Sequence, residues 1–278
     1  MVYLILAMAS SMGVSVIMRL SERHVKNDVS MLALNYLMCA LLARAYMGPI
    51  SAVSGVAGGG FALGLGTVNG ALYLGSFLLL QWNIRENGVV LPATFMKLGV
   101  LVPTVMSIVV FHEIPSLFQA TDFLAAIVAI VMIRFERGAG KVKSALGLVL
   151  LLLGGGATDA TSKIYEELGE PALKNGFLLC TFVVALALCV ILCMVRRQGL
   201  APADAAFGLL IGIPNYFSAR FLLLALSGVP AVVAYPMYST GTIALVTLIG
   251  VACFGERLSR RQTAAMGIIL AALAMLNL

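Results

Sequence analysis

Three charged side chains lie within long apolar segments of this chain: Lys97, Asp159 and Arg220. A charge in the hydrocarbon of a bilayer costs roughly 2.5–3.5 kcal/mol on insertion scales, so such residues need a partner or a wet cavity. Lys97 and Arg220 could each bind a carboxylate or a phosphate, and the guanidinium could do so with two parallel hydrogen bonds. Structural ion pairs, or for Lys97 an amine that reaches the membrane surface, would explain the same residues.

Asp159 follows three consecutive glycines and precedes Lys163 by about one helical turn. If its carboxyl group faces a cavity near Lys97 or Arg220, it is a candidate proton-coupling residue. The alternative is an ion pair with Lys163 on one face of the same helix. Lys163 itself lies near the expected end of its helix, where a long side chain can reach the membrane surface, so we expect it to have a structural role.

Neutral polar side chains provide further candidates for substrate binding. Asn69 and Asn215 lie in corresponding positions of two similar segments, and they could contact one substrate or join neighbouring helices. Tyr235, Tyr238 and Thr240 belong to one apolar segment, in which the rings could stack on a substrate or pack against neighbouring helices.

Two prolines interrupt each of the segments 89–110 and 229–253: Pro92 and Pro103 in the first, Pro230 and Pro236 in the second. A proline inside a membrane helix removes a backbone hydrogen bond and predicts a bend or an unwound turn. Proline-interrupted helices in corresponding positions of two halves indicate a binding site between the halves.

The composition requires that these residues be positioned by membrane helices. Of the 278 residues, 61% are hydrophobic and 11% are charged, and the mean hydropathy is +1.04. A soluble domain could not cover so much apolar surface. The net charge of +6 in such a chain favours basic loops beside anionic lipid over nucleic-acid binding. The five cysteines lack the paired spacing of a metal or haem site, and we expect no cofactor.

A helix needs roughly 20 apolar residues to cross the hydrocarbon core. The sequence predicts ten such spans, and therefore an all-α polytopic membrane protein. The predicted spans are residues 2–18, 29–47, 56–80, 89–110, 117–133, 145–163, 176–195, 207–227, 229–253 and 262–278. The odd-numbered loops carry 13 Lys and Arg. The even-numbered loops carry 3 when Arg44 and Lys163, which lie at the ends of their spans, are counted with them, so the positive-inside rule places both termini outside the cytoplasm.

Two sequence matches indicate an internal duplication. The pattern F-x-E-x-x-S-x-x-Q occurs at residues 111–119 and again at 254–262, with an offset of 143. Phe61, Gly66 and Asn69 match Phe207, Gly212 and Asn215 with an offset of 146. An odd number of spans in each half inserts the two halves in opposite orientations. We therefore predict two inverted five-helix repeats, 1–138 and 139–278, around a central cavity.

The segment FGERLSRRQTAAMGIILAALAML at 254–276 and its echo FHEIPSLFQATDFLAAIVAI at 111–130 resemble the closing helix pair of EamA-type members of the drug/metabolite transporter superfamily. The resemblance implies a ten-helix carrier with inverted repeats that moves metabolites, amino acids, nucleotide sugars or drugs. Members of this family usually have basic termini, which this chain lacks, so its orientation is inferred from the loop charges.

These observations predict a secondary transporter that moves a small polar or anionic metabolite by alternating access, with coupling to protons through Asp159 as an option. Export of amphipathic cationic drugs, an intramembrane enzyme acting on lipid-linked substrate, and a passive channel are the alternatives. The chain has no HExxH, GxSxG or phosphate-loop motif, so we expect no enzymatic activity. We expect a bacterial inner-membrane or plasma-membrane protein that acts as a monomer or homodimer, with the bilayer and a small-molecule substrate as partners.

Overall fold

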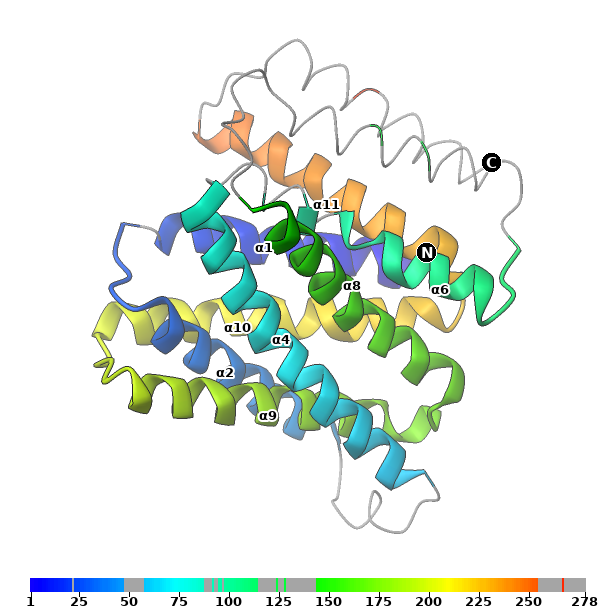
Figure 1. Cartoon of the computed structure of the whole chain (residues 1–278), viewed down its shortest axis with the longest axis horizontal. Coiled ribbons are helices and arrows are strands. Elements are labelled where there is room, and N and C mark those ends of the chain that lie inside the picture. Colours follow the sequence, from blue (N-terminus) through cyan, green and yellow to red (C-terminus); the bar gives the residue numbers. More distant parts are fainter. Residues whose placement is uncertain are drawn as a thin grey trace.

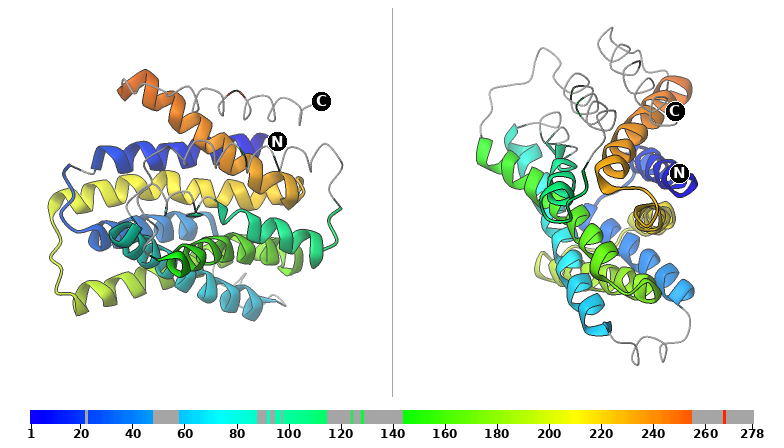
Figure 2. Two further views of the ribbon diagram at one scale, coloured as in Figure 1. Left: turned by 45° about the horizontal axis from the view of Figure 1, so that its top comes forward. Right: turned by 90° about the vertical axis from the view of Figure 1, so that its right-hand side faces the viewer.

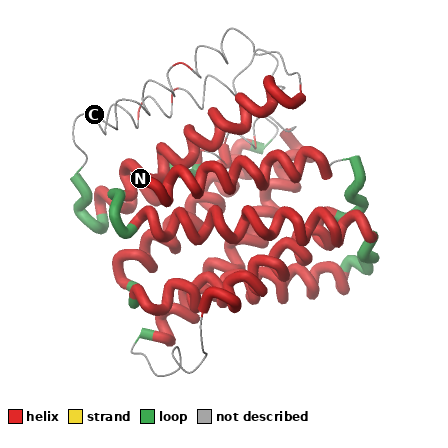
Figure 3. Tube along the Cα trace, turned by 180° about the vertical axis from the view of Figure 1, so that it is seen from behind, coloured by secondary structure: helices red, strands yellow, loops and turns green. Residues whose placement is uncertain are grey.

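The computed structural model describes residues 1–21, 23–47, 58–87, 92, 95–96, 98–114, 124, 128, 144–254 and 267. Within these residues the regular structure is helical and contains no strand (Figure 3). Seven of the described helices are long and apolar enough to cross a membrane. This agrees with the predicted all-α membrane protein. The predicted spans 117–133 and 262–278 lie almost wholly outside the described residues.

Four described helices precede residue 138: α1 (Val2–Ser21), α2 (Asp28–Met47), α4 (Gly59–Asn87) and α6 (Leu101–Val109). The later helices are α8 (Ala145–Leu168), the 3-10 turn η1 (Pro171–Leu173), α9 (Lys174–Val195), α10 (Pro202–Leu226) and α11 (Ala231–Phe254). Short connections join α8 to α9, α9 to α10 and α10 to α11, so consecutive helices run in alternating directions (Figure 1).

Several helices extend beyond the predicted apolar spans. α4 continues to Asn87 instead of ending at residue 80, and α8 continues to Leu168 instead of ending at residue 163. The additional turns contain polar residues such as Gln81 and Glu166. Hydropathy marks only the part of a helix that matches the hydrocarbon, whereas the backbone hydrogen bonds continue until a turn or a cap ends them.

The prolines have different effects in the two corresponding segments. In the first, Gly99 and Val100 form a turn immediately before α6, as expected for an interrupted helix. In the segment 229–253, the prediction of an interrupted helix is wrong. α11 passes through Pro236 without interruption, and Pro230 lies just before the helix begins. A proline ahead of the first helical turn removes no helical hydrogen bond, and membrane helices tolerate an internal proline when neighbouring groups support the backbone.

α2 and α9 pack against each other at the centre of the described bundle. α10 packs on α2 and α4 packs on α9, while α1 covers α10 and α8 covers α4. α11 contacts both α1 and α6, and α6 also contacts α8 (Figures 1 and 2). The larger buried cluster joins α2, α4, α9 and α10, and a second buried cluster joins α1, α10 and α11.

Small residues allow the central helices to approach closely. A Cβ atom on Gly70 of α4 would lie 2.5 Å from the carbonyl oxygen of Thr181 on α9. A Cβ atom on Gly212 of α10 would lie 2.7 Å from the carbonyl oxygen of Asn35 on α2. These distances are too short for any side chain, so glycine at both positions brings each helix pair into backbone contact, as in other membrane bundles.

Candidate functional site

Polar side chains from four helices meet around Asp159 of α8. The Asp159 carboxylate is close enough to the phenols of Tyr73, Tyr235 and Tyr238 to interact with them electrostatically. Tyr73 belongs to α4, and Tyr235 and Tyr238 belong to α11. We call these four residues, together with Ser11 of α1 and Ser218 of α10, the Asp159 cluster. It is the candidate functional site.

Hydrogen bonds fix the two tyrosines that α11 contributes to the Asp159 cluster. The Tyr238 hydroxyl lies 2.8 Å from the Ser218 hydroxyl oxygen, and it also forms a hydrogen bond with Ser11. The Tyr235 hydroxyl donates to the backbone carbonyl oxygen of Asp159 at 2.7 Å. Tyr235 and Tyr238 are three residues apart in a helix, so both rings project from the same side of α11. The cluster therefore links α11 to α8 on one side and to α1 and α10 on the other.

The members of the cluster differ in exposure. Tyr235 is fully buried, whereas Asp159, Tyr73 and Tyr238 are partly exposed within the described residues. Asp159 lies in the middle of an apolar helix, where a charge requires polar partners or a wet cavity. This arrangement can bind a polar group by hydrogen bonds from hydroxyls, or a cation by the carboxylate and the aromatic rings.

An aromatic group extends from Tyr73 into the centre of the bundle. The Tyr73 ring centroid lies 6.0 Å from that of Tyr36 on α2 and 6.1 Å from that of Phe182 on α9. The Phe182 centroid lies 6.3 Å from that of Tyr216 on α10. These separations are typical of interacting aromatic pairs. The rings connect the Asp159 cluster to the contact between α2 and α9.

Arg220 lies in a separate aromatic environment near the end of α10. Its Nη1 atom donates to the Tyr216 hydroxyl at 2.9 Å, and its guanidinium stacks 4.0 Å from the centroid of the Tyr46 ring. Stacking on an aromatic face orients the guanidinium and leaves its edges for hydrogen bonds. Arg220 is partly exposed, and binding of an anion by this side chain stays a prediction.

The two predicted asparagines each join helices. Asn69 is buried on α4; its amide donates to the Thr181 hydroxyl at 3.4 Å, and its oxygen accepts from the Thr161 hydroxyl at 2.7 Å. The Asn215 amide donates to the side-chain oxygen of Asn35 at 3.1 Å. The structure therefore shows that both residues join helices, and a role in substrate binding stays a prediction for them.

A second charged group surrounds Lys163, which is 1% exposed. Its Nζ atom lies 2.7 Å from Oε1 of Glu113 and 3.3 Å from Oε2 of Glu166, and it also contacts Glu167. We call these four residues the Lys163 cluster. The ammonium is also 5.7 Å from the centroid of the Phe111 ring. Lys163 is thus buried among carboxylates, which agrees with the structural role expected for it.

The remaining predicted residues have different outcomes. Lys97 lies outside the described residues. The Thr240 hydroxyl is buried and donates to the carbonyl oxygen of Pro236 on its own helix at 2.7 Å, so it supports the helix after the proline. Tyr73 was not among the predicted site residues, although it follows Asn69 by one helical turn in the same span. Glu113 belongs to the repeated F-x-E pattern, but its ion pair with Lys163 was not predicted.

The described residues contain no group of three or more His, Cys, Asp and Glu side chains that could hold a metal ion. All five cysteines are free. The three carboxylates of the Lys163 cluster are not a metal site, because they surround the ammonium group of Lys163. The chemistry of the described part of the chain is therefore that of carboxylates, phenols, amides and basic side chains.

Comparisons with known proteins agree with this picture. A family model described as Small Multidrug Resistance protein matches residues 176–269. An uncharacterized protein from Haemophilus influenzae is 23% identical over 198 residues, which are 69% of this chain and 67% of that protein. A crystal structure of a protein superposes with a TM-score of 0.75 at 14% identity, over 99% of this chain and 95% of that chain.

These similarities support conclusions at different levels. The structural likeness shows that the fold of nearly the whole chain occurs in a solved protein. The family match and the seven apolar helices together indicate a multi-pass membrane protein of a small-molecule transporter type. The matched family model is not the EamA type to which the sequence patterns point, so that more specific resemblance contributes only to the proposal below.

Proposed function

We propose that this protein is a secondary carrier that moves a small polar or anionic metabolite by alternating access. The observation that carries the proposal is the Asp159 cluster. A partly exposed intramembrane carboxylate lies beside three phenols, and the cluster draws residues from five helices of an apolar bundle. Such convergence in the interior of a helix bundle is typical of binding sites. In this proposal Asp159 also binds the coupling proton, and the EamA resemblance supports the same function.

Two inverted five-helix halves, 1–138 and 139–278, form part of the proposal. The hydrogen bonds of the two asparagines support it: Asn69 of α4 is joined to Thr181 of α9, and Asn215 of α10 is joined to Asn35 of α2. With the offset of 146, Asn69 corresponds to Asn215 and Asn35 corresponds to Thr181. Exchanging the two halves therefore converts each hydrogen bond into the other. A pseudo-two-fold axis between oppositely inserted halves would generate such exchanged pairs.

The packing of the other helices follows the same exchange. α1 covers α10 as α8 covers α4, and α1 contacts α11 as α8 contacts α6. Tyr36 and Phe182 differ by the same 146 positions, and their rings stack on each other with centroids 6.4 Å apart. Exchanging the two halves converts this pair of residues into itself, so the pair would lie on the proposed two-fold axis, between α2 and α9. Rocking of the two halves about this contact would open the Asp159 cluster to each side in turn.

The preference for a polar or anionic substrate depends on the basic side chains. Arg220 is partly exposed and oriented by Tyr46 and Tyr216, and Lys97 adds a second intramembrane cation by sequence. Together they outnumber Asp159, so an anionic group on the substrate could be neutralised. The hydroxyls of Tyr238 and Ser218 would then bind polar groups of the substrate.

Export of amphipathic cations is a second candidate, and a specific observation favours it. Asp159 interacts electrostatically with the phenols of Tyr73, Tyr235 and Tyr238, and a carboxylate near aromatic residues is suited to a cation. The match of residues 176–269 to the Small Multidrug Resistance model supports the same candidate. The two candidates share one site and differ in the charge of the substrate.

A transport assay in proteoliposomes tests the proposal. The probes are radiolabelled amino acids, nucleotides and sugar phosphates for the first candidate, and ethidium for the second. We expect saturable uptake of at least one probe by the wild-type protein. Asp159→Asn removes the charge without changing the shape, and a loss of about 1.4 kcal/mol of binding would lower the affinity for that probe about tenfold. Asp28→Asn, on the exposed first turn of α2, is the matched control.

The outcomes separate the alternatives. Equal uptake by Asp159→Asn and the control would remove Asp159 from the site. Single-channel currents in place of saturable exchange would contradict a carrier, and a chemically altered product in the presence of lipid extract would indicate an enzyme. Saturable ethidium transport without transport of any metabolite probe would replace the first candidate with the second.

A further inference from the structure

The hydroxyl groups of Ser11, Tyr238 and Ser218 form a chain of hydrogen bonds with a fixed direction. The Ser218 hydroxyl donates to the backbone carbonyl oxygen of Ala7 on α1 at 3.3 Å. A serine hydroxyl has one proton, so the bond of 2.8 Å between Tyr238 and Ser218 uses the proton of Tyr238. The Tyr238 hydroxyl therefore accepts the hydrogen bond that it forms with Ser11. We call these three residues the hydroxyl chain, which ends at a carbonyl oxygen that can only accept.

The hydroxyl chain belongs to one group of packed helices. α1 packs on α10 and on α11, and each of these helices contributes one hydroxyl (Figures 1 and 2). The protons of all three hydroxyls are used within this group. What remains on the oxygen atoms of Ser11 and Tyr238, which are both partly exposed, is the capacity to accept further hydrogen bonds.

Tyr235 connects the hydroxyl chain to Asp159 without adding a free donor. Its hydroxyl donates its single proton to the backbone carbonyl oxygen of Asp159 at 2.7 Å. This bond holds α8 against the helix that carries Tyr238, and the Asp159 carboxylate interacts electrostatically with both phenols. The two tyrosines of α11 therefore have no proton left to donate to a substrate.

The Asp159 carboxylate adds a negative charge to these acceptors. Both of its oxygen atoms accept hydrogen bonds when it is ionised. The partly exposed ring of Tyr73 adds an aromatic face, which attracts cations. A ligand group that matches this side of the cluster is positively charged and donates several hydrogen bonds. A primary ammonium group has this chemistry, because it has three N–H donors and no acceptor.

Other charged groups fit these acceptors less well. An anionic group would meet the Asp159 carboxylate, and it would receive no proton from the phenols of α11. A quaternary ammonium group has the required charge but no N–H, so it would leave the oxygen atoms of Tyr238 and Ser11 without partners. Burying an acceptor without a partner costs free energy. An anionic part of the substrate would instead bind near Arg220, in its separate aromatic environment.

We propose that the Asp159 cluster is a subsite for a primary ammonium group, and that the transported metabolite carries a protonated amine. The ammonium donates to the Asp159 carboxylate and to the hydroxyl oxygens of Tyr238 and Ser11, and no covalent bond forms or breaks. The hydroxyl chain sets the preference for N–H donors, because it keeps the Tyr238 proton bonded to Ser218. This inference rests on the proposed transport function and names the chemical class of its substrate.

Ligand-dependent stabilisation of the purified full chain in detergent tests the subsite. The probes are propylammonium, propyltrimethylammonium and 1-propanol, which share a three-carbon chain and differ in the head group, at constant ionic strength. A ligand that binds the folded state raises the melting temperature with its concentration, which gives an apparent Kd. We expect propylammonium to bind about tenfold more tightly than either other probe, which corresponds to about 1.4 kcal/mol.

Two variants test whether the hydroxyl chain causes this preference. Tyr238→Phe removes the phenol oxygen and keeps the ring, so the affinity for propylammonium should fall about tenfold, and the affinity for propyltrimethylammonium should not. Exclusion of the larger head group by shape alone would survive this change. Ser218→Ala is a smaller change that returns the Tyr238 proton to the site, and it should also weaken the preference. It keeps the test decisive if Tyr238→Phe does not fold.

Tyr3→Phe is the matched control. Tyr3 is an exposed tyrosine of α1 whose ring stacks on that of Phe221, with centroids 6.2 Å apart. The substitution removes a phenol hydroxyl outside the Asp159 cluster and keeps the ring. This variant should bind the three probes as the wild-type protein does.

Binding and transport are measured separately, so the subsite and the proposed function can fail separately. Equal affinity of the wild-type protein for propylammonium and propyltrimethylammonium, or no saturable stabilisation by propylammonium, would overturn the subsite even if a metabolite is transported. A preference that persists in both Tyr238→Phe and Ser218→Ala would overturn it as well. A preference that these variants remove, in a protein that transports none of the metabolite probes, would instead contradict the carrier function.

Discussion

At the scale of single residues, the charged side chains show what a sequence can predict about a site. Asp159, Tyr235 and Tyr238 were identified as candidates because a polar group in an apolar segment needs a reason to be there, and the structure brings these three residues together. Tyr73 was not predicted, because an aromatic residue in an apolar segment violates no local pattern. The repeated F-x-E pattern included Glu113, but the pattern indicated no ion-pair partner for this residue.

The buried ammonium of Lys163 leads to a prediction about stability. Lys163→Met leaves three carboxylates without their cation, and breaking a buried ion pair on one side costs about 3–5 kcal/mol. We expect a clearly lower apparent melting temperature for the purified protein in detergent. The double variant Lys163→Met with Glu113→Gln should recover part of the loss, because it removes one of the uncompensated charges.

Lys26→Met is the control for this prediction, because Lys26 is exposed in the connection between α1 and α2. A change at an exposed position of this kind usually alters stability by no more than about 0.5 kcal/mol. Equal melting temperatures for Lys163→Met and Lys26→Met would show that the Lys163 cluster contributes little to stability.

At the scale of elements, close helix contacts organise the centre of the bundle. α4 packs on α9 where Gly70 faces the Thr181 carbonyl, and α10 packs on α2 where Gly212 faces the Asn35 carbonyl. Gly66 and Gly212 occupy matching positions in the two repeated segments, but the sequence does not identify the helices that face them. A glycine shows that something approaches closely, whereas the approaching partner depends on the arrangement of the whole bundle.

Gly70→Ala tests the contact between α4 and α9. The added methyl group would lie 2.5 Å from the Thr181 carbonyl oxygen, which neither backbone can accommodate without moving. Overpacking of this kind costs about 1–3 kcal/mol. We expect a lower melting temperature and a smaller monodisperse fraction in size-exclusion chromatography.

Gly64→Ala is the matched control, because Gly64 lies on the same helix and has open space where a Cβ atom would be. Alanine is the better helix former, by about 1 kcal/mol in an exposed helix interior, so this variant should be as stable as the wild-type protein or more stable. Equal destabilisation by the two substitutions would contradict the close contact of α4 with α9.

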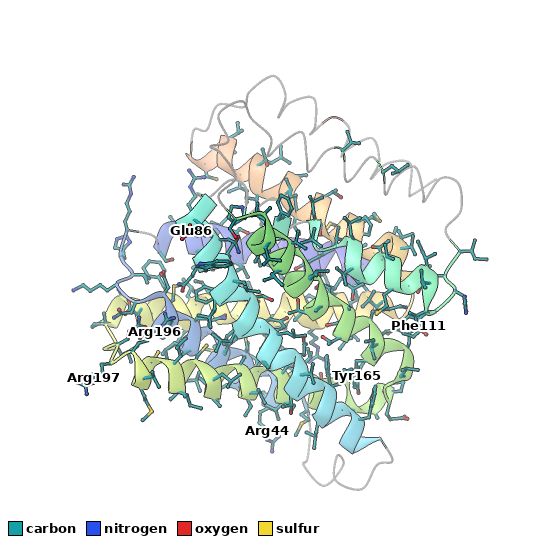
Figure 4. The ribbon with its side chains drawn as sticks, in the orientation of Figure 1. Arg44, Glu86, Phe111, Tyr165, Arg196 and Arg197 are labelled. Atoms are coloured by element: carbon teal, nitrogen blue, oxygen red, sulfur yellow. The ribbon has the colours of Figure 1, made fainter. Side chains whose placement is uncertain are left out.

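At the scale of the whole molecule, the two ends of the bundle differ in charge. Arg196 and Arg197 lie at one end of the long axis, and Phe111 and Tyr165 lie towards the other (Figure 4). The second end also has the acidic residues Glu166, Glu167 and Glu170 near the end of α8. Basic residues favour the cytoplasmic side, so the orientation inferred from the loop charges predicts that the end with Arg196 and Arg197 is cytoplasmic.

Fusions to alkaline phosphatase, which is active only outside the cytoplasm, test this orientation in a bacterial host. A fusion after Gln198, in the connection between α9 and α10, should be inactive. A fusion after Gly169, in the connection between α8 and α9, should be active. The reverse pattern would show that the termini are cytoplasmic, which is the usual arrangement of the EamA-type proteins that the sequence resembles.

The amino-acid sequence was enough to establish a helical membrane protein, because each apolar run of about 20 residues matches the thickness of the hydrocarbon core and a helix satisfies its own backbone. It also identified Asp159 and the tyrosines of α11 as unusual in such runs. The partners of these residues became visible only in the folded chain. Contacts such as Lys163 with Glu113, or Asn69 with Thr181, join helices far apart in the chain, and the crossing of those helices depends on packing that no local pattern specifies.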